Sequence, residues 1–186
     1  MVDVSLIQPV SQVAAALSVC IAAIYYVMNL RETTKNRRIT FTNSVMQQLL
    51  SEEGVLKEND CYAMQWKDFD DFKKKYDSRV NPEMYSKRMS LWLTYNSIGF
   101  LYRSGLIDLE TVVKVSGGLF LWDWVKFKPI IEEYRKHELG PFGFSDFEYL
   151  AESALRWREK FEPNVRARYD RVGREYDEAY LEKSKN

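Results

Sequence analysis

The longest uninterrupted apolar stretch of the chain lies near its start. Between Val10 and Leu30 the sequence VSQVAAALSVCIAAIYYVMNL contains no charged residue. As an α-helix these 21 residues rise about 31 Å, which matches the hydrocarbon thickness of a bilayer, about 30 Å. A buried core helix is the alternative, but it would be unusually long for one without a polar face. The pattern predicts a transmembrane helix over residues 10–30.

The charges that flank this run predict its orientation. The start, MVDVSLIQP, contains no base and therefore lacks the basic region of a secretory signal peptide. One acid and four bases follow the run: Glu32, Arg31, Lys35, Arg37 and Arg38. The positive-inside rule then places residues 1–9 outside and the rest of a single-pass membrane protein in the cytoplasm. The four bases also suit anionic lipid head groups or a partner protein.

One face of the predicted transmembrane helix consists of small residues. Ala14, Ser18 and Ala22 follow one another at a spacing of four, which places them on one side of a helix. Small side chains at this spacing let two membrane helices approach closely. We therefore expect helix packing at this face, although alanine is common in membrane spans without any such role.

The remainder of the chain reads as helical, because strictly alternating strand patterns are absent and helix-terminating signals are frequent. We expect an all-α protein in which the transmembrane helix continues into a small multi-helix domain. The expected parts are a juxtamembrane helical extension over 31–54, a cytoplasmic helical domain over 55–162, and a C-terminal amphipathic helix over 163–186.

Three local signals predict helix starts. Asn81 followed by Pro82 is typical of an N-cap and the first helical position. Asp108 is expected to cap a short helix. Ser145 and Glu148 form a capping box, in which each side chain would bond to a backbone N–H at the other end of the first turn.

The final segment carries an apolar stripe at four-three spacing, which includes Tyr169, Val172 and Tyr176. This stripe is too short for a self-standing coiled coil. We expect an amphipathic helix that packs on its own domain, and the alternative is a helix that docks on a partner.

Composition and charge exclude several classes of protein. The apolar fraction of 46% argues against a disordered chain, and the balance of 27 bases and 27 acids argues against nonspecific nucleic-acid binding. Cys20 and Cys61 are too few for a disulfide scaffold. His137 is the single histidine and lies in a charged stretch, so a histidine-based metal or catalytic site is not expected. No cofactor motif is present, and we expect no cofactor.

Two short segments carry candidate chemistry. Trp122 and Trp124, followed by two lysines, suit a membrane surface or partner contact, although packing in the core is the plainer interpretation. Asp68, Asp70 and Asp71 resemble half of a calcium loop, but the glycine and terminal glutamate of such loops are missing. An acidic helix face that pairs with the lysines at 73–75 explains them better.

Short motifs between Phe100 and Ala151, together with the N-terminal architecture, resemble a family of small prokaryotic proteins of unknown function. In order these motifs are Gly105-Leu106-Ile107-Asp108, Gly117-Gly118, Trp124, Lys128-Pro129-Ile130-Ile131, Arg135 and Phe147-Glu148-Tyr149-Leu150-Ala151. The resemblance implies a prokaryotic membrane helix with a basic exit and a helical cytoplasmic domain. It implies no catalytic residue.

Three functions remain open on the sequence. The leading expectation is a non-enzymatic accessory or regulatory subunit that binds an integral membrane protein or complex at its cytoplasmic face. The alternative is a homo-oligomeric membrane-tethered scaffold or sensor. The third is an enzyme that uses carboxylates alone, among them Asp123, Glu132 and Glu133; a buried acid with a raised pKa in a deep pocket would favour it.

Overall fold

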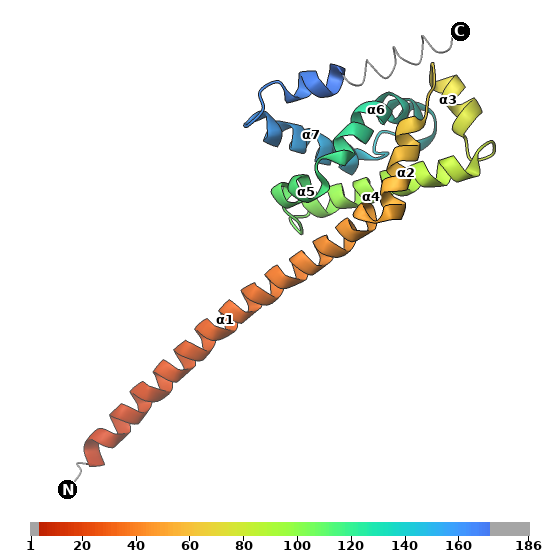
Figure 1. The fold of residues 1–186 in the computed structure, drawn as a ribbon. Helices are drawn as coiled ribbons and strands as arrows, with labels where there is room; N and C mark the ends of the chain where they lie inside the picture. Colours follow the sequence, from red (N-terminus) through yellow and green to blue (C-terminus); the bar gives the residue numbers. More distant parts are fainter. Residues whose placement is uncertain (1–3, 172–186) are drawn as a thin grey trace. The chain divides into compact units, whose positions relative to one another are not determined.

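The computed structural model describes residues 4–171, and it confirms the all-α fold class (Figure 1). The described part contains helices and connecting turns, with no strand. The helices are α1 (Val4–Leu50), α2 (Glu52–Ala63), α3 (Phe69–Tyr76), α4 (Pro82–Arg103), α5 (Leu109–Ser116), α6 (Leu119–Tyr134), the π-helical turn η1 (Arg135–Leu139) and α7 (Ser145–Glu159).

The chain divides into two compact units, residues 1–41 and 42–186. The first unit contains most of α1, and its stretch Ser11–Ser44 includes a window that is long and apolar enough to cross a membrane. No residue of that window is buried within the protein. The apolar segment therefore has the solvent exposure of a membrane-spanning helix rather than that of a core helix.

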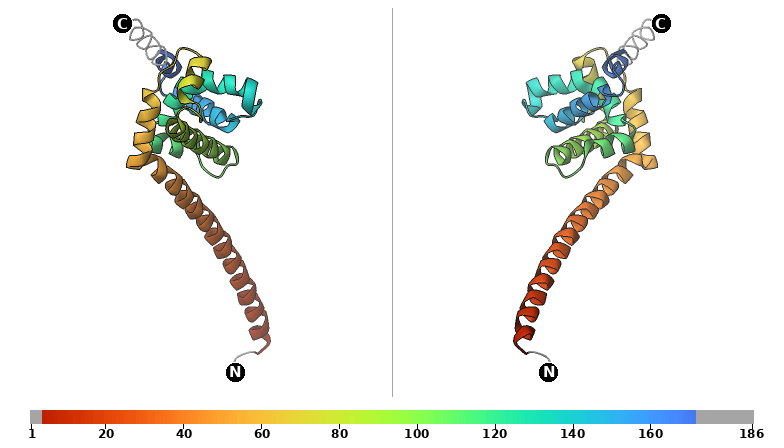
Figure 2. Two further views of the ribbon diagram at one scale, coloured as in Figure 1. Left: turned by 90° about the vertical axis from the view of Figure 1, so that its right-hand side faces the viewer. Right: turned by 90° about the vertical axis from the view of Figure 1, so that its left-hand side faces the viewer.

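The core of the second unit is built around α4. This helix packs against α7, α2 and α3, and α7 also contacts α5 and α6. Figure 2 shows α4 and α7 side by side, as their close packing requires. Aromatic and aliphatic side chains fill the interior, among them Trp92, Tyr95, Ile98, Phe120, Leu121, Trp124, Phe127, Phe147 and Leu150. Burial of these large side chains is the main stabilising contribution.

The second unit, which is the helical domain, begins earlier in the chain than the sequence pattern predicted. α1 ends at Leu50, and the Ser51 hydroxyl accepts a hydrogen bond from the backbone N–H of Gly54 at 3.0 Å. This cap starts α2, an element that no sequence signal predicted. Met46 and Leu49, expected in a juxtamembrane extension, are instead part of the core. The described core therefore starts before residue 55.

The expected capping box at the start of α7 is wrong. Phe144 occupies the N-cap with a left-handed backbone, φ 55°, and supplies no side-chain cap. The amide oxygen of Asn96, on α4, accepts hydrogen bonds from the backbone N–H groups of Asp146 and Phe147 at 3.2 and 3.1 Å. Glu148 pairs with Arg135 at 2.8 Å instead of reaching back along its own helix. The helix start is satisfied from a neighbouring helix.

Candidate functional site

Two carboxyl groups lie together inside the second unit. Glu58 comes from α2 and is 4% exposed, and Asp123 comes from α6 and is fully buried. The two side chains lie within hydrogen-bonding reach of each other. Acidic residues are almost never fully buried unless they are paired, so this carboxyl pair is the unusual polar feature of the core.

The four oxygens of the carboxyl pair differ in whether they accept a hydrogen bond. Tyr95 on α4 donates its phenolic hydrogen to Oε2 of Glu58 at 2.9 Å. Tyr62 also lies within hydrogen-bonding reach of Glu58. Within the described residues, no donor reaches Oε1 of Glu58 or either oxygen of Asp123. Ionised carboxylates have no hydrogen to donate, so a hydrogen bond between the two requires a proton on one of them.

Burial dominates the ionisation of both groups. Removal from water raises the pKa of Asp123 well above its usual range, and the neighbouring Glu58 raises that pKa further, while Lys126 opposes the rise. Burial also raises the pKa of Glu58, against the hydrogen bonds from Tyr95 and Tyr62. Two adjacent carboxylates in a medium of low dielectric cannot readily both be charged, so the pair retains a proton above the usual carboxyl range.

A buried cation, Arg88, lies about two turns before Tyr95 on α4. The guanidinium carbon of Arg88, a fully buried residue, lies 4.6 Å from the ring centre of Phe72 and 4.8 Å from that of Trp92. The ring centres of Tyr85 and Tyr134 lie 5.2 and 5.9 Å from the same guanidinium carbon. Among the described residues no carboxylate forms an ion pair with it. The negative faces of the rings therefore compensate this charge.

Cys61 lies about one turn after Glu58 on α2, and both the acidic pair and this cation influence its thiol. The residue is fully buried. Burial raises the pKa of its thiol, Asp123 and Glu58 raise it further, and Arg88 lowers it. A thiol with this pKa stays protonated at neutral pH, and only the thiolate is nucleophilic. The cysteine is a packing residue in the folded state.

The residues expected on the apolar helix are all exposed where their side chains are described. Ala14, Ser18 and Ala22 lie at the surface of α1, and the Ser18 hydroxyl donates to the carbonyl oxygen of Ala14 at 2.8 Å. Arg31, Lys35 and Arg37 are also exposed. The side chain of Arg38 lies outside the description. The small-residue face and the described basic cluster are therefore available for contacts.

The expected aromatic contacts are used within the domain. Trp124 is buried, and Trp122 is half-buried with its ring centre 4.3 Å from that of Tyr169. Tyr169 is buried as well, and its phenolic oxygen accepts a hydrogen bond from Arg158 at 2.8 Å. These rings pack on their own domain. Val172 and Tyr176 lie outside the described residues.

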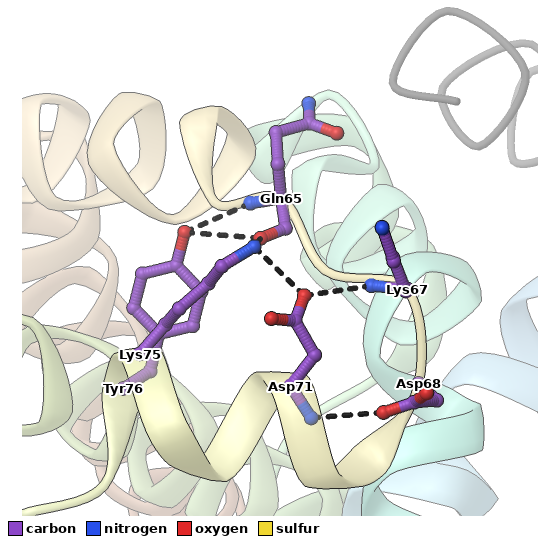
Figure 3. Close-up of polar contacts among 6 residues, drawn as sticks. All are labelled: Gln65, Lys67, Asp68, Asp71, Lys75 and Tyr76. Carbon is purple, nitrogen blue, oxygen red and sulfur yellow. Dashed lines mark hydrogen bonds and ion pairs between the residues drawn. The ribbon is translucent and has the colours of Figure 1, made fainter. Parts of the chain in front are cut away.

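The aspartates that resembled half of a calcium loop organise the start of α3 (Figure 3). Asp68 caps the helix by accepting from the backbone N–H of Asp71 at 2.8 Å. Asp71 accepts from Lys75 at 2.7 Å and from the backbone of Lys67 at 3.0 Å. Across residues 4–171, no cluster of three or more His, Cys, Asp or Glu side chains suits a metal ion.

The three acids named for carboxylate catalysis do not form one site. Glu132 and Glu133 lie at the surface of α6, where they face Lys128 at 3.9 Å and Lys136 at 2.6 Å. Asp123 is paired in the core instead. Its partner Glu58 was missed because α2 carries no start signal beyond Ser51.

The matched family covers both the apolar segment and most of the helical domain. The family described as "Domain of unknown function (DUF4760)" matches residues 12–157. No curated protein and no solved structure matches the chain.

Proposed function

We propose, from the premise that the chain belongs to the DUF4760 family of domains of unknown function, that it is a non-enzymatic, membrane-anchored accessory or regulatory subunit. In this proposal its helical domain lies at the cytoplasmic face of a prokaryotic cell membrane and binds an integral membrane protein or complex. The observation that carries the proposal is the exposed apolar surface of α1 within Ser11–Ser44.

This apolar surface is extensive. Five aliphatic side chains in the first half of the segment are between 58% and 69% exposed: Val13, Leu17, Val19, Ile21 and Ile24. Each such side chain gains about 1.5–3 kcal/mol when it leaves water, so an aqueous environment would be strongly unfavourable. A bilayer removes the whole surface from water at once. The exposed bases Arg31, Lys35 and Arg37 then favour a cytoplasmic position for the rest of the chain.

The chemistry of the domain supports a binding role. A substrate in solution does not reach Asp123, because the residue is fully buried. Cys61 is buried and its raised pKa keeps the thiol protonated. Asp68 and Asp71, which resembled ligands, hold the start of α3. The reactive residue types that the sequence offered are thus occupied with structural contacts.

The small-residue face of α1 is the proposed contact with the membrane partner. Two variants with the same chemical change test it: Ala14→Leu combined with Ala22→Leu on the face, and Ala16→Leu on the opposite side of the helix. Full-length protein in native membranes would be cross-linked within the bilayer. We expect the double variant to lose at least about tenfold of the heterologous cross-link, since bulky side chains prevent close approach. Equal cross-linking by all three proteins would contradict the proposal.

A homo-oligomeric scaffold is the second candidate. A face of small residues on one helix is self-complementary, so two copies of α1 could pack through it. Cross-linking of purified full-length protein in detergent distinguishes the two. A cross-linked dimer that depends on Ala14 and Ala22 supports the scaffold, whereas a monomer that cross-links only in native membranes supports the accessory subunit.

A further inference from the structure

One proton on the carboxyl pair balances the charges of the buried residues Glu58, Asp123 and Arg88. Arg88 contributes one positive charge and lies among aromatic rings, and the half-buried Lys126 adds a further positive charge near Asp123. Glu58 and Asp123 would contribute two negative charges if both were ionised. With one proton between them they contribute a single negative charge. The proton also supplies the hydrogen for the contact between two groups that otherwise only accept.

We propose that Glu58 and Asp123 form a binding site for a single proton, and that this proton fastens α2 to α6 as a pH-dependent latch. The inference goes beyond the proposed function, because it assigns a ligand and a regulatory role to the core. The geometry carries it: two buried carboxyls from different helices lie within hydrogen-bonding reach of each other, and Tyr95 on a third helix donates to one of their oxygens at 2.9 Å. The other three oxygens meet no donor among the described residues.

Each element around the pair presents groups that influence the proton. α2 itself contributes Cys61 and Tyr62, and Cys61 is held neutral by burial. α4 contributes Tyr95, whose pKa burial raises well above the usual range, so it remains a neutral donor. α6 contributes Lys126, which attracts the charge of Asp123 and bonds to the backbone oxygen of Tyr62.

The other buried charged group is Arg88 on α4, which interacts electrostatically with Cys61. Lys126 favours loss of the proton from Asp123, while burial and the neighbouring carboxyl favour its retention. Burial is the largest influence on both carboxyls. The proton therefore leaves only above the usual carboxyl range.

Loss of the proton weakens the junction between the two helices. The O–H bond of the carboxylic acid breaks, the proton passes to solvent water, and two carboxylates remain in contact inside the core. Their repulsion and their unfavourable burial both favour separation of α2 from α6. α2 follows α1 after the single residue Ser51, so this proton controls the element that directly follows the membrane-anchored helix in the chain.

Infrared spectroscopy tests for the proton itself. A protonated carboxylic acid gives a carbonyl stretching band that carboxylates lack. We expect the difference between full-length wild type and Asp123→Asn at pH 6 to contain this band. The control is Glu132→Gln, which removes an exposed carboxyl from the same helix and should leave the band unchanged. A wild-type protein without a buried carboxylic acid band would overturn the inference, whatever the variants do.

The reactivity of Cys61 tests the latch. In a Cys20→Ala background Cys61 is the single thiol, and a water-soluble maleimide reaches it only when α2 opens. The labelling rate of Cys61 with Asp123 intact is divided by the rate in Asp123→Asn at the same pH. This ratio removes the pH dependence of the thiol chemistry, which both proteins share. We expect this ratio to rise between pH 6 and pH 9, by up to about tenfold per unit, the limit for one linked proton.

A labelling-rate ratio that stays constant between pH 6 and pH 9 would overturn the proposal of a latch. Should Asp123→Asn fail to fold, Glu58→Gln takes its place in the comparison, because it also neutralises one member of the pair. Neither measurement involves a partner protein, so failure of the latch is distinguishable from failure of the proposed accessory function.

Discussion

Arg88 shows how a single residue depends on side chains that are distant in sequence. Its guanidinium contacts Phe72 of α3, Trp92 of α4 and Tyr134 of α6. A planar, weakly hydrated cation stacks on rings, whereas the compact ammonium of lysine retains its water more strongly. From the sequence alone Arg88 is one more base on a mixed helix. Its burial follows from rings that only the fold brings together.

Gly99 is required by the close crossing of α4 and α7. A Cβ built at this position would lie 2.0 Å from the carbonyl oxygen of Asp146, which is backbone and cannot turn away. We expect Gly99→Ala to lower the free energy of unfolding by about 1–3 kcal/mol or more, as overpacking does. The measurement is urea unfolding of the full-length protein in detergent.

The matched control for this change is Ser97→Ala, on the exposed side of the same helix. It also places an alanine in α4 but introduces no clash, so its unfolding midpoint should stay close to that of the wild type. A Gly99→Ala protein as stable as Ser97→Ala would show that the two helices can separate without cost.

At the scale of elements, two of the three predicted helix caps are confirmed. Asn81 accepts from the backbone N–H of Met84 at 3.1 Å, and Asp108 accepts from that of Thr111 at 2.8 Å, as predicted. The capping box at Ser145 failed because the cap of α7 comes from Asn96, on another helix. Local chemistry predicts a helix start only while no neighbouring element supplies the cap.

A cap from Asn96 and a capping box at Ser145 predict opposite orders of stability for alanine variants at the two positions. We expect Asn96→Ala to lower the free energy of unfolding by about 1–2 kcal/mol, since two backbone donors at the start of α7 lose their acceptor. Ser145→Ala should cost less than about 0.5 kcal/mol, because Ser145 lies inside the helix and does not cap it. Urea midpoints of the two variants would reverse in order if the capping box formed.

The candidate site could be predicted only in part. Asp123 is flanked by two tryptophans in the sequence, and it lies on the buried side of α6 with Phe120 and Phe127. Glu58 did not stand out, since α2 has no distinctive pattern and the partner carboxyl is far away in sequence. A contact between two acids is contrary to pairing rules based on charge, so sequence reasoning matches neither acid to the other.

At the scale of the whole molecule, the carboxyls predict the pH dependence of stability. The raised folded-state pKa of Asp123 means that the folded protein binds more protons than the unfolded chain above about pH 4. That stability is therefore present at low pH and is lost as pH rises through the folded pKa. The lowered pKa values of Asp71 and Asp108 act oppositely, and their stability is lost as pH falls below about 4.

We therefore expect the free energy of unfolding to be greatest on the acid side of neutrality and to fall with rising pH. One linked proton allows a slope of up to about 1.4 kcal/mol per pH unit. Urea unfolding of the full-length protein between pH 5 and pH 9 measures it, and Asp123→Asn should flatten the alkaline side. Stability that increases steadily from pH 5 to pH 8 would contradict a raised folded-state pKa.

The last prediction concerns the residue at which the helical domain begins. The sequence pattern predicted residue 55, whereas the second unit of the structure begins at residue 42. A fragment of residues 42–186 retains Met46 and Leu49 in its core, whereas a fragment of 55–186 loses both, together with the Ser51 cap. Loss of two buried side chains costs about 3–6 kcal/mol, a large share of the 5–15 kcal/mol that stabilises a typical domain.

We expect the 42–186 fragment to fold in aqueous buffer with a urea midpoint close to that of the full chain in detergent, because its core is complete. The 55–186 fragment should unfold at much lower urea concentration or aggregate. Equal midpoints for the two fragments would mean that the last turns of α1 contribute nothing to the domain. A difference would show that the last turns of α1 are a structural part of the helical domain.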